Sequence, residues 1–196
     1  MYEYTDKVLS HLNKKLIRSF KKLKRSILAF DEVNQIENNV NDCYKTCFRE
    51  VRMRYLDIAK HAYKEAGGSD DTAIDIMWID GFLNEYDPVT KYVFTREFDR
   101  KRARAFESLV ATKNPKEADV ALRYLAGQVR QWGDETTDKA TLQAYKDNGV
   151  KRVRWNTEKD SRVCAICGER NNEIYDIDKI PDKPHPGCRC WLTPVK

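Results

Sequence analysis

Four of the six cysteines and one of the three histidines lie in one stretch near the end of the chain, CAICGERNNEIYDIDKIPDKPHPGCRC. Cys164 and Cys167 form a CxxC pair, a spacing at which two thiolates on a tight turn can reach the same tetrahedral ion. His185, Cys188 and Cys190 supply donors for the other half of a site. This pattern predicts a structural Zn²⁺ site with five candidate ligands for four positions, and the choice between Cys188 and Cys190 stays open.

Other uses of these cysteines fit the surrounding sequence less well. A thioredoxin-like redox pair needs its CxxC in a βαβ unit, which the flanking residues do not predict. A zinc deaminase places H-x-E ahead of P-C-x-x-C, whereas His185 follows the CxxC and no glutamate accompanies it. A water-activating zinc needs an open coordination position and a general base, and neither is evident. We therefore expect a structural metal site and no enzymatic activity.

The start of the chain bears on the redox state of these thiols. MYEYTDKVLSHLNKK lacks the apolar core and the small-residue cleavage site of a secretory signal. We therefore expect synthesis in a reducing cytosol, where disulfides are the weaker explanation for the cysteines.

The segment that carries the candidate ligands, residues 150–196, differs from the rest of the chain. VKRVRW alternates like a strand, ERNNEIYDI indicates a short hairpin around Asn171 and Asn172, and the prolines of IPDKPHP exclude a helix. So short a segment usually needs a metal, disulfides or a partner to stay folded. Structural zinc contributes about 10 to 16 kcal/mol near neutral pH. We therefore predict a zinc-binding module over residues 150–196, with Trp155 and Trp191 packed near the metal.

Residues 1–149 are predicted to form a helical body. The chain has no glycine or proline before Gly67, and apolar residues recur at threes and fours, which predicts long helices over residues 1–66. The second apolar stripe, from Val33 to Ala62, has an eleven-residue period that suits a straight helix. Asp31 is a candidate cap for this second helix, although a continuous helix through residue 30 stays open. Cys43 and Cys47 on this stripe are expected to be buried apolar thiols.

Shorter helices are expected over residues 69–149. Their predicted limits are a capped start at Ser69 to Asp71, a start at Thr95, a helix from Asn114-Pro115 to Trp132, and a last helix from about Asp138 to Asn148-Gly149. The predicted fold class is mainly α: an elongated multi-helix body with a small C-terminal α+β module, stapled by zinc and containing a β-hairpin.

Basic residues form two dense bands on predicted helices. Seven lysines and arginines lie between positions 11 and 25 with no acid among them, and a second band runs from Arg96 to Arg104. Clustered charge can attract a polyanion although the net charge is only +5. A solvated helix face is the alternative explanation for each band. The candidate nucleic-acid-binding residues are Lys14, Lys15, Arg18, Lys21, Lys22, Arg100, Lys101, Arg102 and Arg104.

The residues around the candidate zinc site resemble a known family. GVKRVRWNTEKDSRVCAICGE and HPGCRCWLTPV are similar to the C-terminal signature of the phage head morphogenesis, or minor head protein, family typified by protein F of phage Mu. That signature has a strand ending in tryptophan, a Thr-x-x-Asp turn, a CxxC pair and a closing H-P-x-C-R-C. Its elements stand here at Trp155, Thr157, Asp160, Cys164, Cys167, His185, Pro186, Cys188, Arg189 and Cys190. Residues 78–109 also resemble the central part of versions from phages of low-GC Gram-positive bacteria.

The resemblance implies a virion component and not an enzyme. Members of this family are minor proteins of the phage head that associate with the portal or the procapsid interior, and some are implicated in DNA packaging or ejection. It implies here a structural minor head protein, made in the host cytoplasm and located at the head interior or the portal vertex. The expected partners are the portal or other head proteins, with phage DNA reached through non-specific phosphate contacts, and no membrane or small-molecule substrate.

The arginines near the candidate metal site leave one alternative function open. Arginines surround the candidate metal site and could contact phosphates: Arg152, Arg154, Arg162 and Arg189. The alternative is therefore a zinc-dependent, non-specific nucleic-acid-binding protein.

Overall fold

The two predicted apolar stripes are the buried faces of the first two helices. The computed structural model describes residues 2–29, 32–89, 91–112, 115–158 and 163–195. Helix α1 (Glu3–Ala29) buries a row of large side chains that starts at Leu9, and α2 (Val33–Glu65) buries its stripe from Ile36 to Ala62, while Val33 is exposed. Helix α2 begins after Glu32, so it is an element separate from α1, and the expected cap Asp31 lies outside the described residues. Cys47 is buried in the core, as expected, whereas Cys43 is only partly buried and packs against it.

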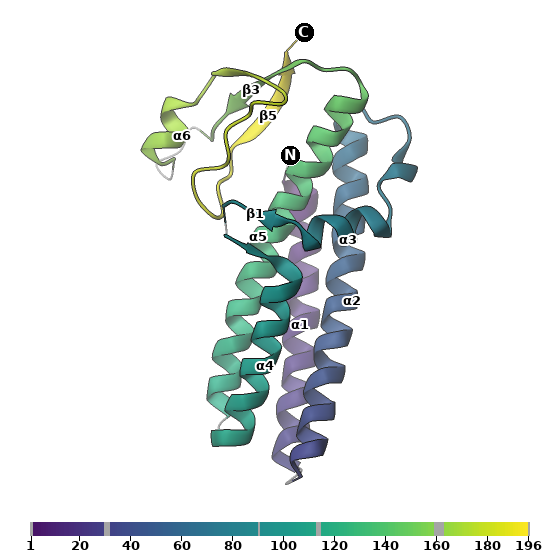
Figure 1. Ribbon diagram of the computed structural model, residues 1–196, viewed down its shortest axis with the longest axis vertical. Helices are drawn as coiled ribbons and strands as arrows, with labels where there is room; N and C mark the ends of the chain where they lie inside the picture. Colours follow the sequence, from purple (N-terminus) through teal and green to yellow (C-terminus); the bar gives the residue numbers. More distant parts are fainter. Residues whose placement is uncertain (1, 30–31, 90, 113–114, 159–162, 196) are drawn as a thin grey trace.

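Two further helices complete an elongated bundle, with the small module at one end (Figure 1). Helix α4 (Phe94–Thr112) starts one residue before the predicted Thr95, and α5 (Pro115–Asp147) carries the expected proline in its first turn. Helix α5 packs against α1, α2 and α4 and continues upward to the module. The structure confirms the predicted class, mainly α with a small C-terminal α+β part.

Helix α5 corrects one predicted boundary, because the two helices expected on either side of residues 133–137 are one continuous helix. The apolar pattern breaks there because buried positions hold threonines: Thr136 and Thr137 are almost completely buried. Their hydroxyls donate to the carbonyls of Trp132 and Gly133 one turn earlier, which satisfies them inside the helix. Because these buried residues are polar, the spacing of apolar residues did not predict that the helix continues through this turn.

Gly133 of α5 faces Leu9 of α1, which allows a matched test of the packing. A Cβ atom at this position would lie 2.6 Å from Cδ2 of Leu9, which is itself buried. We expect Gly133→Ala to lower the free energy of unfolding by about 1 to 3 kcal/mol because of overpacking. Gly127→Ala on the same helix meets no described atom within 4 Å, so we expect it to stabilise by about 0.5 to 1 kcal/mol. Urea unfolding measures both, and a shift of the same sign for the two variants would contradict this packing.

The segment between α2 and α4 differs from the expected capped helix. Asp70 caps only the short 3-10 turn η1 (Asp71–Ala73), and α3 (Ile76–Asn84) starts later, where the Asp75 carboxylate accepts the N–H of Trp78 at 2.9 Å. A small antiparallel ribbon of β1 (Tyr86–Asp87) and β2 (Tyr92–Val93) then leads into α4. Several aspartates compete as caps in this stretch, and the sequence predicted the wrong one.

The module is built on a three-stranded antiparallel sheet with the strand order β4-β3-β5. Strand β3 (Arg152–Asn156) is the predicted alternating strand, with Val153 and Trp155 buried. The expected hairpin around Asn171 and Asn172 is corrected: this turn joins the short helix α6 (Ala165–Glu169) to β4 (Ile174–Asp176), and β4 pairs with β3. Strand β5 (Trp191–Val195) pairs with the other edge of β3.

The sheet packs on the end of α5. Tyr145 of α5 forms a small buried cluster with Val153 and Ile177, and its hydroxyl donates to the carbonyl of Leu192 at 3.2 Å. Gly149, with φ of 70°, ends the helix as predicted and redirects the chain into β3. Among the described residues, none of the helices is both long and apolar enough to cross a membrane.

Candidate metal centre

A short helix fixes the two cysteines of the CxxC pair. Cys164 is the N-cap of α6, and its sulfur accepts the backbone N–H of Cys167 at 3.4 Å. The cap therefore directs both sulfur atoms to the same side of the turn. Thr157 supports this turn from the preceding segment, because its N–H and its hydroxyl both donate to Oδ1 of Asn171 at 3.1 Å. Asp160, the other residue of the Thr-x-x-Asp signature, lies outside the described residues.

The second half of the candidate site comes from the loop before β5. Nδ1 of His185 lies 3.1 Å from the carbonyl oxygen of Pro186, so an N–H at Nδ1 can donate to it. This leaves Nε2 to face Cys167, whose sulfur is 3.8 Å away. Metal-ligating histidines commonly hold one ring nitrogen in this way, which fixes the tautomer and orients the other nitrogen.

All five predicted donors converge around Cys167. Its sulfur belongs to two groups whose donor atoms lie within 4.8 Å of one another, one with Cys164 and His185 and the other with Cys188 and Cys190. The sulfurs of Cys167 and Cys188 are 3.5 Å apart. Sulfurs bound to one tetrahedral zinc at a Zn–S distance near 2.3 Å are separated by about 3.8 Å. All six cysteines are free thiols, so the donor set fits a metal such as zinc.

Burial and hydrogen bonding act differently on these thiols. The N–H of Cys167 lowers the pKa of the Cys164 thiol because it donates to that sulfur. Burial raises the pKa of Cys188 to about 11 and that of Cys167 further. Without a cation, buried thiols therefore stay protonated, whereas a bound divalent ion stabilises thiolates outright.

An aromatic and apolar shell surrounds the thiols. Trp155 is 2% exposed and packs in one cluster with Cys167, Cys188 and Cys190. The guanidinium of Arg170 lies 5.2 Å from the centre of the Trp155 ring, and Tyr175 meets the same ring edge to face. Trp191, also expected near the metal, is half-buried and lines a cleft against α5. The shell excludes water from one side of the donors, which strengthens their interaction with a cation.

Residues 101–193 match a family model described as phage Mu protein F like protein. This region of the chain is similar to the phage Mu protein F like family. The matched region contains α4 from residue 101 onward, the whole of α5, and all five candidate ligands, so the predicted resemblance is confirmed. No significant match was found among the curated proteins or among the solved structures.

A largely buried polar network ties the candidate metal loop to the helical body. The Lys183 ammonium contacts the Asp138 carboxylate of α5 and donates to the carbonyl of Cys188 at 3.1 Å. The Tyr2 hydroxyl donates to Asp138 at 2.6 Å and reaches the carbonyl of Cys190 at 3.1 Å. We call Tyr2, Asp138 and Lys183 the latch. The sequence reading missed all three, because the contacts that join them to one another and to Cys190 span 45 to 188 positions of the chain and leave no local pattern.

The Lys183 ammonium interacts electrostatically with three carboxyl groups of α5, those of Asp134, Glu135 and Asp138. The side chains of Lys183 and Asp138 are only 13% and 17% exposed. Burial raises the pKa of Asp138, and it also raises the pKa of Asp134 to about 6 and that of Glu135 to about 7. Burial acts in the opposite direction on Lys183, but Asp138 and Glu135 outweigh it and raise the Lys183 pKa. The Lys183 ammonium therefore stays protonated, while the neighbouring carboxyl groups ionise at a higher pH than exposed carboxyl groups do.

Glu135 gives a pH-dependent prediction. A free glutamate ionises near pH 4.5, whereas folding holds Glu135 protonated up to about pH 7, so the folded state binds more protons and loses stability as the pH rises through this window. We expect Glu135→Gln to raise the free energy of unfolding at pH 8 by about 2 kcal/mol and to have little effect at pH 4.5. Urea titrations at both pH values measure this, with the exposed Glu107→Gln as the control. A gain for Glu135→Gln that is equal at both pH values would contradict the assignment.

The basic band of α1 is exposed to solvent. Lys15 pairs with Glu50 of α2 at 3.0 Å. The other predicted phosphate contacts on this helix are exposed on its outer face: Lys14, Arg18, Lys21 and Lys22.

The basic band of α4 is engaged within the protein. Arg100 donates to Glu97 at 2.6 Å, and Lys101 is buried with its ammonium 3.5 Å from the same carboxylate. Arg102 donates to Asp99 at 3.1 Å and to Asn41 at 2.6 Å, while Arg104 is exposed. The α4 band is therefore largely neutralised by its own helix.

Proposed function

We propose that this protein is a structural minor head protein of a bacteriophage, which docks at the portal or the procapsid interior and assists head assembly, DNA packaging or DNA ejection. The observation that carries the proposal is the family match over residues 101–193, which spans the candidate ligands and the helix on which their module rests. The family indicates a phage head morphogenesis protein. It also indicates a place in the virion and other head proteins as partners.

We further propose that residues 150–196 form a module stabilised by structural Zn²⁺, attached to a helical body of residues 1–149. Cys164, Cys167 and His185 would supply three ligands, and Cys188 or Cys190 would supply the fourth. The spacing of the donors and the orientation of His185 support this. In this role zinc holds the fold together and performs no reaction, which agrees with the structural character of the family.

Two measurements test the proposal. Elemental analysis of the purified protein should give one zinc ion per chain. The same measurement on Cys188→Ser and on Cys190→Ser identifies the fourth ligand, because only the variant that lacks this ligand should lose zinc. Affinity capture from phage-infected cells should recover the portal protein or another head protein, and purified virions should contain this chain. Absence of this chain from both procapsids and mature virions would disprove the function. Zinc-free, folded protein would disprove only the metal site.

The exposed basic face of α1 supports a second candidate function, a zinc-dependent, non-specific nucleic-acid-binding protein. Its lysines and arginines could contact phosphates in the absence of any base-reading element. Affinity for duplex DNA measured over a range of salt concentrations separates the two candidates. Micromolar affinity that falls steeply with salt would favour this second function, since each phosphate contact releases counterions.

A further inference from the structure

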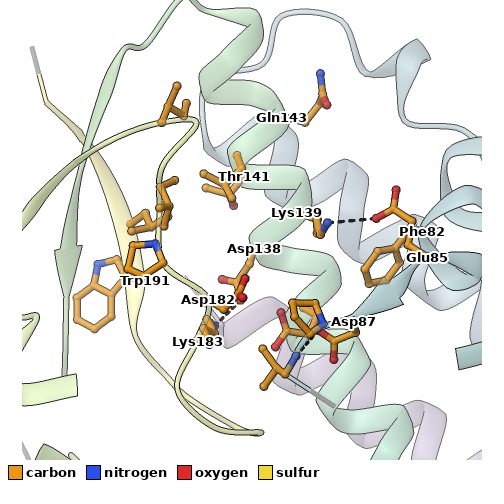
Figure 2. Close-up of a pocket in the computed structure, with 18 of the residues that line it drawn as sticks. Phe82, Glu85, Asp87, Asp138, Lys139, Thr141, Gln143, Asp182, Lys183 and Trp191 are labelled. Carbon is orange, nitrogen blue, oxygen red and sulfur yellow. Dashed lines mark hydrogen bonds and ion pairs between the residues drawn. The ribbon is translucent and has the colours of Figure 1, made fainter. Parts of the chain in front are cut away.

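A cleft separates the module from the helical body. Its volume is about 620 Å³, which is within the usual range of binding pockets. Figure 2 shows α5 as its floor, with Phe82, Glu85 and Asp87 on one side and Asp182, Lys183 and Trp191 on the other. The cleft is therefore bounded by α3 and β1 of the body, by α5, and by the loop that leads to the candidate metal ligands.

The cleft has a charge opposite to that of the whole chain. Six acidic residues line it and only three lysines, although the protein carries a net charge of +5. Each lysine contacts one of these acids: Lys139 pairs with Glu85, Lys146 with Asp178, and Lys183 with Asp138. Among the described residues, no lysine or arginine forms an ion pair with Glu135 or Asp182, so their carboxyl groups are available to a ligand. A negative excess concentrated in a partly enclosed cleft raises the local potential and attracts cations.

The walls of the cleft are aromatic as well as acidic. Trp78 and Trp191 both line it and are only half-buried, and Phe82 stacks on Trp78 with ring centres 6.0 Å apart. Exposed indole faces beside carboxylates are suited to guanidinium and ammonium groups, which gain both cation–π and ionic contacts. Phosphates would be repelled by the same carboxylates.

We propose that this cleft binds an extended segment of a partner protein that carries arginine or lysine between apolar residues. Its basic side chains would lie against Asp182 and Glu135, and its apolar side chains would pack on Trp78 and Trp191. Recognition would therefore depend on charge complementarity at an aromatic surface. The inference rests on the proposed docking role and specifies the chemistry of the partner.

The test uses the full-length protein and two short fluorescein-labelled peptides. One alternates arginine with leucine and serine, and the other has glutamate in place of each arginine. Fluorescence anisotropy at physiological salt measures their affinities. We expect the arginine peptide to bind at least about tenfold more tightly than the glutamate peptide. We also expect its binding to weaken by about tenfold in Asp182→Asn/Glu135→Gln, and to weaken in Trp78→Ala.

The matched control is Asp42→Asn, which removes an exposed carboxylate on α2 that does not line the cleft. It should bind the arginine peptide like the wild type. Equal affinity for the two peptides, or wild-type affinity in the double variant, would overturn the proposal. Analytical ultracentrifugation tests whether a second copy of this chain fills the cleft instead. Self-association of the wild type that is lost in the double variant would identify that second copy as the occupant. This result would also overturn the proposal. Zinc content and virion composition do not depend on these peptides, so they test the proposed function separately.

Discussion

Replacing Cys167 by serine is expected to release the metal and to unfold residues 150–196 while the helical bundle stays folded. Cys167 is the donor that both groups of candidate ligands share, and serine is a poor substitute for a thiolate on zinc. Structural zinc contributes about 10 to 16 kcal/mol near neutral pH, whereas a whole domain is stable by only about 5 to 15 kcal/mol. The small clusters around Trp155 and Val153 are too limited to replace that contribution.

Hydrogen exchange and elemental analysis check this prediction. Amides of residues 150–196 should lose protection, and those of α1 and α2 should keep it, because the bundle has its own core. Circular dichroism should therefore retain most of the helical signal. The control is Cys43→Ser, which removes a thiol packed in the bundle and leaves all five candidate ligands in place. A Cys167→Ser protein with full zinc content and wild-type protection would refute the zinc-stabilised module.

Replacing Lys183 by methionine is expected to destabilise the protein by about 3 to 5 kcal/mol at pH 8, because it leaves the buried Asp138 carboxylate without its cation. Methionine keeps the apolar stem beside the Tyr2 ring, over which the ammonium lies 5.4 Å from the ring centre. The loss should be smaller at pH 5, because burial raises the pKa of Asp138 and a protonated Asp138 no longer buries a charge. Urea unfolding at the two pH values measures both effects.

Lys146→Met is the matched control for the latch. Lys146 pairs with Asp178 at 3.0 Å in the same cleft, but these side chains are 47% and 78% exposed. Exposed pairs contribute at most about 1 kcal/mol, so this variant should remain close to the wild type. Asp138→Asn/Lys183→Met should recover part of the stability, since it removes the unpaired charge. Similar losses for Lys183→Met and Lys146→Met would show that the latch is no stronger than a surface ion pair.

The latch links the candidate metal centre to the body. Lys183 and Tyr2 contact the backbone carbonyls of Cys188 and Cys190, so the ligand loop, the residue that precedes α1, and α5 share one polar network. Loss of the metal would free this loop, and loss of the latch would release it from α5. The position of the module on the bundle, and with it the width of the cleft, therefore depends on both.

The long helices α1 and α2 could be predicted because their sequences repeat one local pattern over many turns. Residues such as Leu12, Leu16 and Ile58 recur at helical spacing, and the same residues are completely or almost completely buried. The predicted helix boundaries were wrong where two residues could both cap a helix, or where buried residues were polar. Asp70 and Asp75 are both good caps, and the buried Thr136 and Thr137 have no apolar signature.

The candidate ligands and the family resemblance could be predicted from the residues alone, because cysteine and histidine donors at fixed spacing are a chemical pattern that short turns can satisfy. The convergence of those donors on Cys167 and the surfaces that surround them emerged only with the folded chain. The latch joins Tyr2 to Cys190 across 188 positions, and the cleft takes its walls from α3, α5 and the module. Such contacts follow from how distant elements pack. Periodicity and spacing describe only neighbours along the chain, so they do not reveal them.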